Sequence, residues 1–131
     1  MQAIRRGLEA YNAGDVEGVI EMTDPEATLV PVRSLLEGGE YRGHDGVRRF
    51  MADMEEDWAE RAVEVEEIRE LDEGVLVLGS FRAVGRSGTE VRYPVAWHSQ
   101  MRDGRLFRLT AYSDRDTALR ELGLVDRAPP D

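Results

Sequence analysis

Two side chains in the C-terminal half of the chain have the chemistry of a small-molecule site. His98 carries an imidazole, which titrates near neutrality and can act as a general acid or base. Arg82 carries a guanidinium, which can bind a carboxylate or an enolate if it points inward. Each also has a purely structural interpretation: a buried neutral histidine held by one hydrogen bond, and an exposed arginine paired with Glu90 or another surface acid.

Several other chemistries are excluded by residue types that the sequence lacks. There is no cysteine, which excludes disulfides, thiol nucleophiles and thiolate metal sites. All 17 basic residues are arginine, so lysine Schiff bases and a Walker-type phosphate lysine are excluded as well. The two histidines, His44 and His98, lie in different elements without the spacing of metal ligands. We therefore expect no metal site and no cofactor.

The charge of the chain argues against a nucleic-acid partner, and the lack of a long apolar stretch argues against a membrane. The formal net charge is −10 at pH 7, whereas nucleic-acid binding depends on cations that neutralise phosphate. Most of the excess acid lies between residues 53 and 73, which we interpret as a solvated surface. No stretch approaches the roughly 20 apolar residues that span a bilayer, and nothing resembles a signal peptide. We expect a cytoplasmic protein.

Hydrophobic periodicity predicts three helices in the N-terminal half. Apolar residues at helical spacing predict one helix over residues 2–11, ended by Gly14, which suits a left-handed cap. Asp15 is expected to cap a second, short helix. A third helix is expected from about residue 43 to 59, with an apolar face made of Val47, Phe50, Met51, Met54 and Trp58.

Alternating patterns predict a sheet from most of the remaining chain. Strands are expected, in chain order, at 27–32, 63–68, 75–84, 91–102 and 106–112.

Three local signals refine this prediction. An extra residue at positions 66–67 would form a β-bulge that restores the alternation of the strand around it. Asp103 and Gly104 form a two-residue hairpin signal. Ser113, with Asp116 three residues later, suits a capping box at the start of a last short helix.

These elements together predict a single α+β domain over residues 1–124, followed by a tail at residues 125–131. We expect a cone-shaped, curved antiparallel sheet with about three N-terminal helices packed on its concave face, plus a short C-terminal helix. Such cones usually enclose an apolar pocket, so a small apolar organic ligand is the expected partner.

Three segments of the chain resemble the SnoaL-like branch of the nuclear transport factor 2-like superfamily. They are Tyr-Asn-Ala-Gly-Asp at 11–15 with the Asp-Pro-Glu-Ala-Thr at 24–28, Tyr-Arg-Gly-His-Asp-Gly-Val at 41–47, and the motifs between 102 and 124. The resemblance covers residues 2–124 and implies the same α+β cone. It implies no single reaction, because the superfamily hosts isomerases, polyketide cyclases, hydrolases, dehydratases and non-enzymatic binders.

The catalytic groups of two relatives are missing at the matching positions. In the ketosteroid isomerases a tyrosine, a general base and an aspartic acid occupy positions that correspond here to Gly7, Pro31 and Ala96, so that route is not supported. Polyketide cyclases of the family resemble acid–base enzymes that use a buried carboxylate. The strands at 91–102 and 105–112 contain no Asp or Glu here, so in this chain such a carboxylate would have to come from elsewhere, from Asp45 or Glu26.

The resemblance, aligned on Pro94, also predicts which face of the strand at 91–102 looks inward. If Ala96 faces the pocket, His98 and Gln100 do as well, because side chains alternate along a strand. The other face is too apolar to be left in water, and relatives commonly pair through the outer face of the sheet. We therefore expect a homodimer interface, rather than a monomer with this face covered by the tail, at Tyr93, Val95, Trp97 and Met101, together with Ser99.

Aromatic and methionine side chains are expected to complete the wall of the pocket, although about half of such stripes belong to a plain core. The predicted pocket consists of Tyr11, Tyr41, Phe50, Met54, Trp58, Arg82, Ala96, His98 and Gln100.

Two classes of function fit these residues. The first is a cofactor-independent isomerase, cyclase or hydratase acting on a small hydrophobic carbonyl compound, with His98 carrying the proton and Arg82 or Gln100 polarising the oxygen. The second is a non-catalytic ligand-binding or dimeric assembly domain, which needs only a pocket of the right shape.

Overall fold

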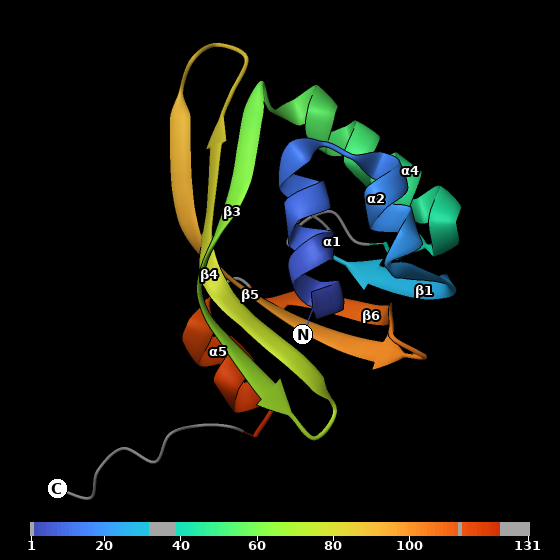
Figure 1. Cartoon of the computed structure of the whole chain (residues 1–131). Coiled ribbons are helices and arrows are strands. Elements are labelled where there is room, and N and C mark those ends of the chain that lie inside the picture. The colour runs from blue at the N-terminus through green and yellow to red at the C-terminus, as the bar shows by residue number, and fades with distance from the viewer. Residues whose placement is uncertain (1, 32–38, 113, 124–131) are drawn as a thin grey trace, which may run out of the picture.

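A computed structural model describes residues 2–31, 39–112 and 114–123 of the chain, and these form a mixed α+β structure (Figure 1). The predicted tail at 125–131 lies outside the described residues. The elements are α1 (Gln2–Ala13), α2 (Val16–Glu21), β1 (Thr23–Val30), β2 (Tyr41–Arg42), α4 (Gly43–Asp57), β3 (Glu60–Leu71), β4 (Gly74–Val84), β5 (Glu90–Arg102), β6 (Arg105–Tyr112) and α5 (Arg115–Glu121).

The six strands form one curved sheet in the order β2-β1-β6-β5-β4-β3. All neighbouring strands are antiparallel except β1 and β6, which run parallel. Helices α1, α2 and α4 lie over the concave face, and α5 lies on the opposite side (Figure 1). The predicted fold class is confirmed, and the parallel pair is the one departure from a wholly antiparallel sheet among the described strands.

A β-bulge in β3 gives the sheet part of its bend. Val65 lies opposite Gly79 and Glu67 opposite Leu78, so one extra residue is inserted in β3, as predicted for positions 66–67. The insertion restores the alternation, and Val63 before the bulge and Ile68 after it both pack into the same core. Gly79 is required at this point, because a Cβ there would lie 2.1 Å from the carbonyl oxygen of Glu64.

Capping and turn residues fix the ends of the elements. The side chain of Asp15 accepts a hydrogen bond from the N–H of Gly18 at 3.0 Å, which confirms the predicted cap of α2. Gly14 has φ 71° and ends α1 as predicted. Helix α5 begins one residue later than the predicted capping box requires: its cap is Asp114, which accepts from the N–H of Thr117 at 2.7 Å, and Ser113 lies outside the described residues.

Two apolar clusters hold the layers together. The larger one fills the space between α1, α2, α4 and the concave face of the sheet. The smaller one joins Ala118 and Leu119 of α5 to Leu76, Leu78 and Ala96 on the convex face. None of the described helices is long and apolar enough to cross a membrane.

Candidate functional site

A cavity of about 80 Å³ lies inside the larger cluster, between α1 and the concave face of the sheet. One wall is formed by Ile4, Leu8 and Tyr11, the apolar stripe that makes α1 amphipathic. The facing wall comes from the inward side of β5 and from its neighbours β4 and β6. Helices α2 and α4 and strand β1 supply the remaining lining.

Gly7 leaves room for this cavity. It lies among the lining residues of α1, and a Cβ placed on it would meet only the Cβ of Met22, at 4.0 Å. A glycine in the middle of a helix costs about 1 kcal/mol relative to alanine, so its presence there is not explained by helix formation.

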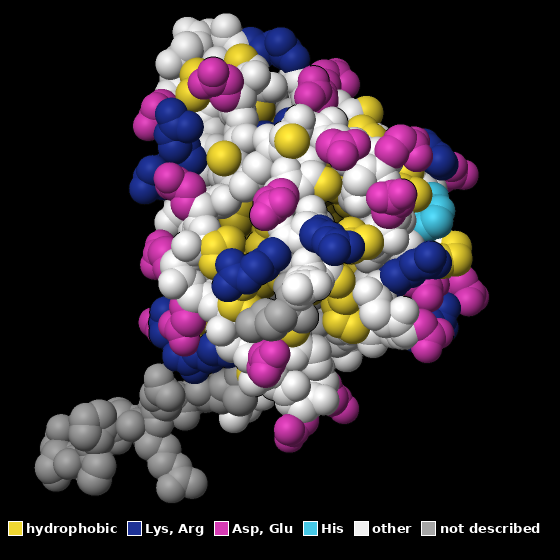
Figure 2. All heavy atoms as spheres, in the orientation of Figure 1, with side chains coloured by type: hydrophobic (Ala, Val, Ile, Leu, Met, Phe, Trp, Pro, Cys, Tyr) yellow, Lys and Arg dark blue, Asp and Glu magenta, His cyan; other side chains and the backbone are white. Residues whose placement is uncertain are grey.

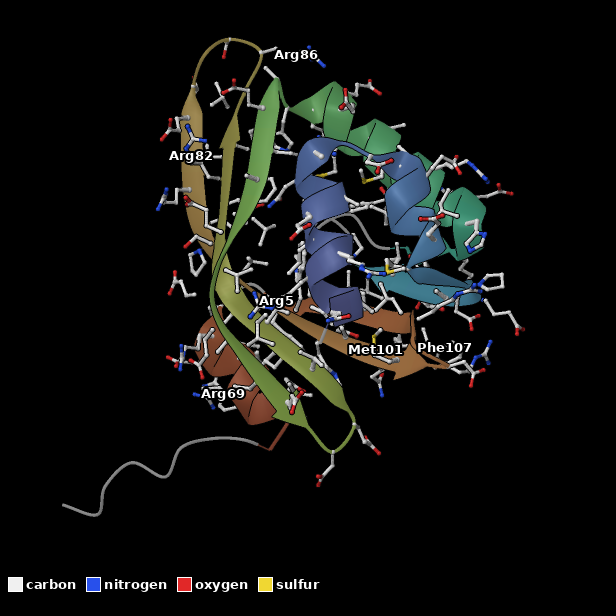
Figure 3. The ribbon with its side chains drawn as sticks, viewed as in Figure 1. Arg5, Arg69, Arg82, Arg86, Met101 and Phe107 are labelled. Carbon is white, nitrogen blue, oxygen red and sulfur yellow. The ribbon has the colours of Figure 1, made fainter. Side chains whose placement is uncertain are left out.

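The cavity opens beside the N-terminal half of α1. The lining residues that keep some exposure include Ala3, Gly7, Met22, Met101 and Leu106. Hydrophobic side chains are visible at the surface in the middle of this face, between basic groups (Figure 2). Figure 3 labels Arg5 and Met101 on the same face.

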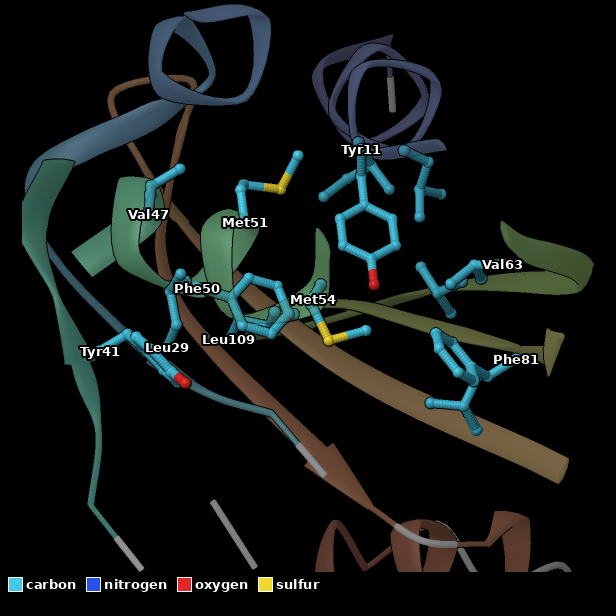
Figure 4. Packing of buried hydrophobic residues seen from close by; sticks show 14 of the residues in the cluster. Tyr11, Leu29, Tyr41, Val47, Phe50, Met51, Met54, Val63, Phe81 and Leu109 are labelled. Carbon is cyan, nitrogen blue, oxygen red and sulfur yellow. The ribbon is translucent and has the colours of Figure 1, made fainter. Parts of the chain in front are cut away.

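Three aromatic rings surround the inner end of the cavity. The rings of Tyr11 and Phe50 are stacked, with centroids 5.9 Å apart and an interplanar angle of 13°. Trp97 meets Tyr11 edge-on at 5.8 Å. Met51 of α4 lines the same region, and Figure 4 shows Tyr11, Phe50 and Met51 projecting from their helices into this core. The inner end therefore presents flat apolar surfaces to any occupant.

Three of the lining side chains carry a hydroxyl group: Tyr11, Thr23 and Ser99. Thr23 donates its hydroxyl hydrogen to the carbonyl oxygen of Val19 at 2.7 Å. Ser99 is only 4% exposed and lines the cavity from β5. Burial raises the pKa of Tyr11 to about 12, an effect that the neighbouring Arg61 partly offsets, so the phenol stays protonated and can donate.

The described residues that line the cavity include no group suited to acid–base chemistry near neutral pH. Among the described residues that line it, none is a histidine, an aspartate or a glutamate. The described part of the chain also brings together no cluster of three side chains able to hold a metal ion.

Only some of the residues predicted for the apolar wall reach this cavity. Tyr11 and Phe50 line it. Tyr41 and Met54 are buried in the surrounding core without lining the cavity, and the hydroxyl of Tyr41 donates to Asp53 at 2.6 Å. Trp58 packs edge-on against Phe81, with ring centroids 5.9 Å apart.

The predicted inward face of β5 is wrong. His98, Ala96 and Gln100 lie on the convex face, where α5 covers Ala96. The imidazole Nε2 of His98 is 2.7 Å from the carbonyl oxygen of Glu73, and the residue is 8% exposed. Side chains alternate along β5 as expected, but the face predicted to point into the cavity points away from it. The imidazole therefore lies outside the cavity.

The apolar residues assigned to a dimer interface face the helices of their own chain instead. Tyr93, Val95, Trp97 and Met101 pack in the larger cluster, and Trp97, Ser99 and Met101 line the cavity. The N-terminal helices bury Val95 and cover Tyr93, Trp97 and Met101 in part.

Arg82 lies on the convex side of the sheet, away from α1 (Figure 3). Its Nη2 is 3.6 Å from Glu90, and its side chain is 36% exposed. The surface ion pair with Glu90, which was the structural interpretation of this arginine, is the one observed.

Arg61 was not among the residues predicted for the site. It lies on β3 opposite Ala83, on the concave side, and its side chain is 7% exposed. Its Cζ lies 5.0 Å from the centroid of the Tyr11 ring. The available signal was its position two residues before Val63. Residues two apart in a strand share a face, so Arg61 and Val63 both point inward.

Residues 4–109 match the family model of the SnoaL-like domain. The chain belongs to the SnoaL-like domain family. No curated protein sequence is significantly similar to this SnoaL-like protein.

Solved structures share its fold. A nuclear transport factor 2-like protein of unknown function from Burkholderia pseudomallei is 25% identical, with a TM-score of 0.78 over 92% of this chain and 94% of that one. TerC, co-crystallised with polyporic acid, is 24% identical, with a TM-score of 0.78 over 92% and 95%. A protein with a ketosteroid isomerase-like fold from Catenulispora acidiphila, in complex with trimethylamine, is 13% identical, with a TM-score of 0.76 over 98% and 97%.

Proposed function

We propose that this SnoaL-like protein binds a small, largely apolar organic molecule in the cavity between α1 and the concave face of the sheet. The observation that carries the proposal is the lining itself, which is apolar apart from a few hydroxyl groups. Small-molecule sites typically combine an apolar concave surface with a small number of placed polar groups.

The hydroxyl group of Ser99 in the lining favours a ligand with one polar atom. A ligand oxygen or nitrogen placed beside it can form a hydrogen bond with this hydroxyl. Tyr11, held in its neutral form by burial, is a second donor from the facing wall. A compact ring or short chain bearing a carbonyl oxygen has the chemistry that these two groups complement.

Methionine side chains allow the cavity to adapt to such a ligand. Its volume of about 80 Å³ is smaller than the roughly 150 Å³ of an engineered apolar cavity that holds benzene. Met22, Met51 and Met101 line it, and unbranched thioether side chains change rotamer at low cost. We expect these three side chains to move when a ring of six atoms enters.

Binding without catalysis is favoured over an isomerase, cyclase or hydratase reaction. General acid–base catalysis needs a group whose pKa lies near the working pH. The pKa of Tyr11, raised to about 12, is far above that range, and the described lining residues offer no carboxylate or imidazole in its place. One chain supplies the whole lining, so the proposed site does not require a dimer.

Methyl NMR of the protein labelled with ¹³C at its methionine methyl groups tests the proposal. On titration with cyclohexanone, the signals of Met22, Met51 and Met101 should shift, whereas Met54, which is buried outside the lining, should not. Methylenecyclohexane, which replaces the oxygen by CH₂, should bind more weakly because it cannot accept a hydrogen bond from Ser99 or Tyr11.

A cavity-filling variant provides the matched control. Gly7→Leu should abolish the cyclohexanone shifts, because the added side chain occupies the space beside Met22. Ala52→Leu adds a group of similar size at an exposed position of α4 and should leave the shifts unchanged. Shifts that persist in Gly7→Leu, or that spread equally to Met54, would contradict binding in this cavity.

A further inference from the structure

Arg61 brings a positive charge into the interior of the protein. Its side chain is 7% exposed, and it enters from β3 between α1 and α4, beside Tyr11 and Met51. Removing a charged group from water is costly unless that group is paired and hydrogen-bonded. The surroundings of Arg61 should therefore contain acceptors that match its guanidinium.

Arg61 has few partners, and one of them is Tyr11, whose side chain is in hydrogen-bond contact with the guanidinium and whose ring lies beside it. Nη1 lies 3.8 Å from a carboxylate oxygen of Glu55, whose own side chain is 67% exposed. Nη2 donates to the thioether sulfur of Met51 at 3.9 Å, and sulfur is a poor acceptor. Nε is buried and has no acceptor among the described residues. A guanidinium offers five N–H donors in a planar fork, so part of this capacity, including Nε–H, is unused.

This unused capacity lies directly behind the wall of the cavity. Tyr11 and Met51 both line the cavity, and both also contact the guanidinium of Arg61. Met51 is the flexible member of the pair, and a change of its rotamer would open a path from the cavity to the arginine. Figure 4 shows Met51 and Tyr11 facing the same core from α4 and α1.

We infer that the ligand of this cavity is an amphipathic carboxylate, whose acid group binds Arg61 and whose apolar body fills the space between α1 and β5. The inference rests on the proposed function and narrows its ligand class. A carboxylate matches the guanidinium with two parallel charge-assisted hydrogen bonds and supplies the counter-charge that Glu55 provides only at a distance. A neutral carbonyl compound would supply neither the charge nor the second acceptor.

The first test compares two ligands of the same shape, cyclohexanecarboxylate and cyclohexanecarboxamide. The wild-type protein should bind the carboxylate about tenfold more tightly than the neutral amide, as expected for a charge-assisted pair. Arg61→Met should remove this preference while keeping the amide affinity. Arg92→Met should retain the preference, because Arg92 is an exposed arginine on the same sheet that pairs with Glu64 at 2.6 Å.

The second test follows ligand binding in the wild-type protein and uses Arg61→Lys only to assign one signal. The Nε–H signal of Arg61, identified in ¹H–¹⁵N spectra of the wild-type protein by its absence in Arg61→Lys, should move downfield when cyclohexanecarboxylate is added. Cyclohexanone should leave this signal in place while it shifts the methionine methyl groups. This readout also applies if Arg61→Met does not fold.

The outcomes separate the two proposals. An unmoved Arg61 Nε–H signal, or equal affinity for carboxylate and amide, with methionine shifts still present, would overturn the carboxylate inference and leave the binding cavity intact. Absence of methionine shifts with every probe would overturn both. Carboxylate preference retained in Arg61→Met would show that another cation holds the acid group, and it would equally overturn the inference.

Discussion

The side-chain amide of Asn12 pairs with the backbone of Val63 as a neighbouring strand would. Its Nδ2 donates to the carbonyl oxygen of Val63 at 3.0 Å, and its Oδ1 accepts from the N–H of Val63 at 2.9 Å. Val63 belongs to β3, the edge strand of the sheet, whose outward backbone groups have no strand beside them. These two hydrogen bonds join the end of α1 to the β3 edge of the sheet, two residues along the strand from Arg61.

Asn12→Ala should lower the free energy of unfolding by about 1–2 kcal/mol, because both groups of Val63 lose their partner. Asn12→Asp should fall between this variant and the wild type, since its carboxylate still accepts from the Val63 N–H. Urea denaturation of the three proteins provides the measurement. Equal stability of Asn12→Ala and the wild type would show that water replaces the amide without cost.

Trp97→Arg should unfold the protein or greatly reduce its stability. Trp97 packs against Tyr11 and lines the cavity, so the substitution places a cation in an apolar interior. Circular dichroism during thermal unfolding checks this, with Ser80→Arg on the convex side of β4 as the control. A stable, folded Trp97→Arg variant that elutes as a smaller species would instead support the dimer interface predicted from the sequence.

His98→Gln should leave ligand binding in the cavity unchanged. The imidazole is hydrogen-bonded to the carbonyl oxygen of Glu73 on the other side of the sheet, so the substitution affects stability by about 1 kcal/mol and not the lining. The cyclohexanone titration, followed at the methionine methyl groups, tests the first part and urea denaturation the second. Loss of the methyl shifts in a folded His98→Gln protein would contradict the placement of the site.

Acid should remove the stabilisation that Asp24 provides. Arg102 donates to its two carboxylate oxygens at 3.0 and 2.8 Å and, with the N–H of Glu26, holds the pKa of Asp24 below its ordinary value. The folded-state pKa is thus lower than the unfolded one, so the stabilisation is complete above the unfolded pKa of about 3.9 and is lost as the pH falls through the folded pKa.

The variant Asp24→Asn isolates this effect. Its stability deficit relative to the wild type should be largest near neutral pH and should shrink as the pH is lowered below about 4. Urea midpoints measured from pH 7 down to pH 3 provide the comparison. A deficit that stays constant over this range would mean that the charge of Asp24 does not stabilise the fold.

The spacing of apolar residues predicted most of the helices and strands, because that spacing depends only on which face of the same element is buried. The stripe of Ile4, Leu8 and Tyr11 located α1, and the out-of-phase Ile68 located the bulge in β3. The parallel pairing of β1 with β6 was not predicted, because strands so far apart in the chain leave no local signal of their partner.

The phase of β5 shows how the site was misplaced. Alignment on Pro94 put Ala96, His98 and Gln100 inside, whereas hydrophobicity favoured Tyr93, Val95 and Trp97 for the face that packs on the helices. The apolar residues were noticed, but they were assigned to a second subunit. For a strand covered by helices of its own chain, the apolar face is the inner face. Arg61 was missed for the converse reason, since a charged residue is expected at the surface.

The cavity beside Gly7 also determines how the protein should respond to hydrostatic pressure. Empty internal space disappears when a chain unfolds, so compression favours the unfolded state in proportion to the void that is eliminated. An occupant of the cavity removes that void from the folded state. The occupied protein should therefore be less compressible, and should withstand higher pressure before unfolding, than the empty one.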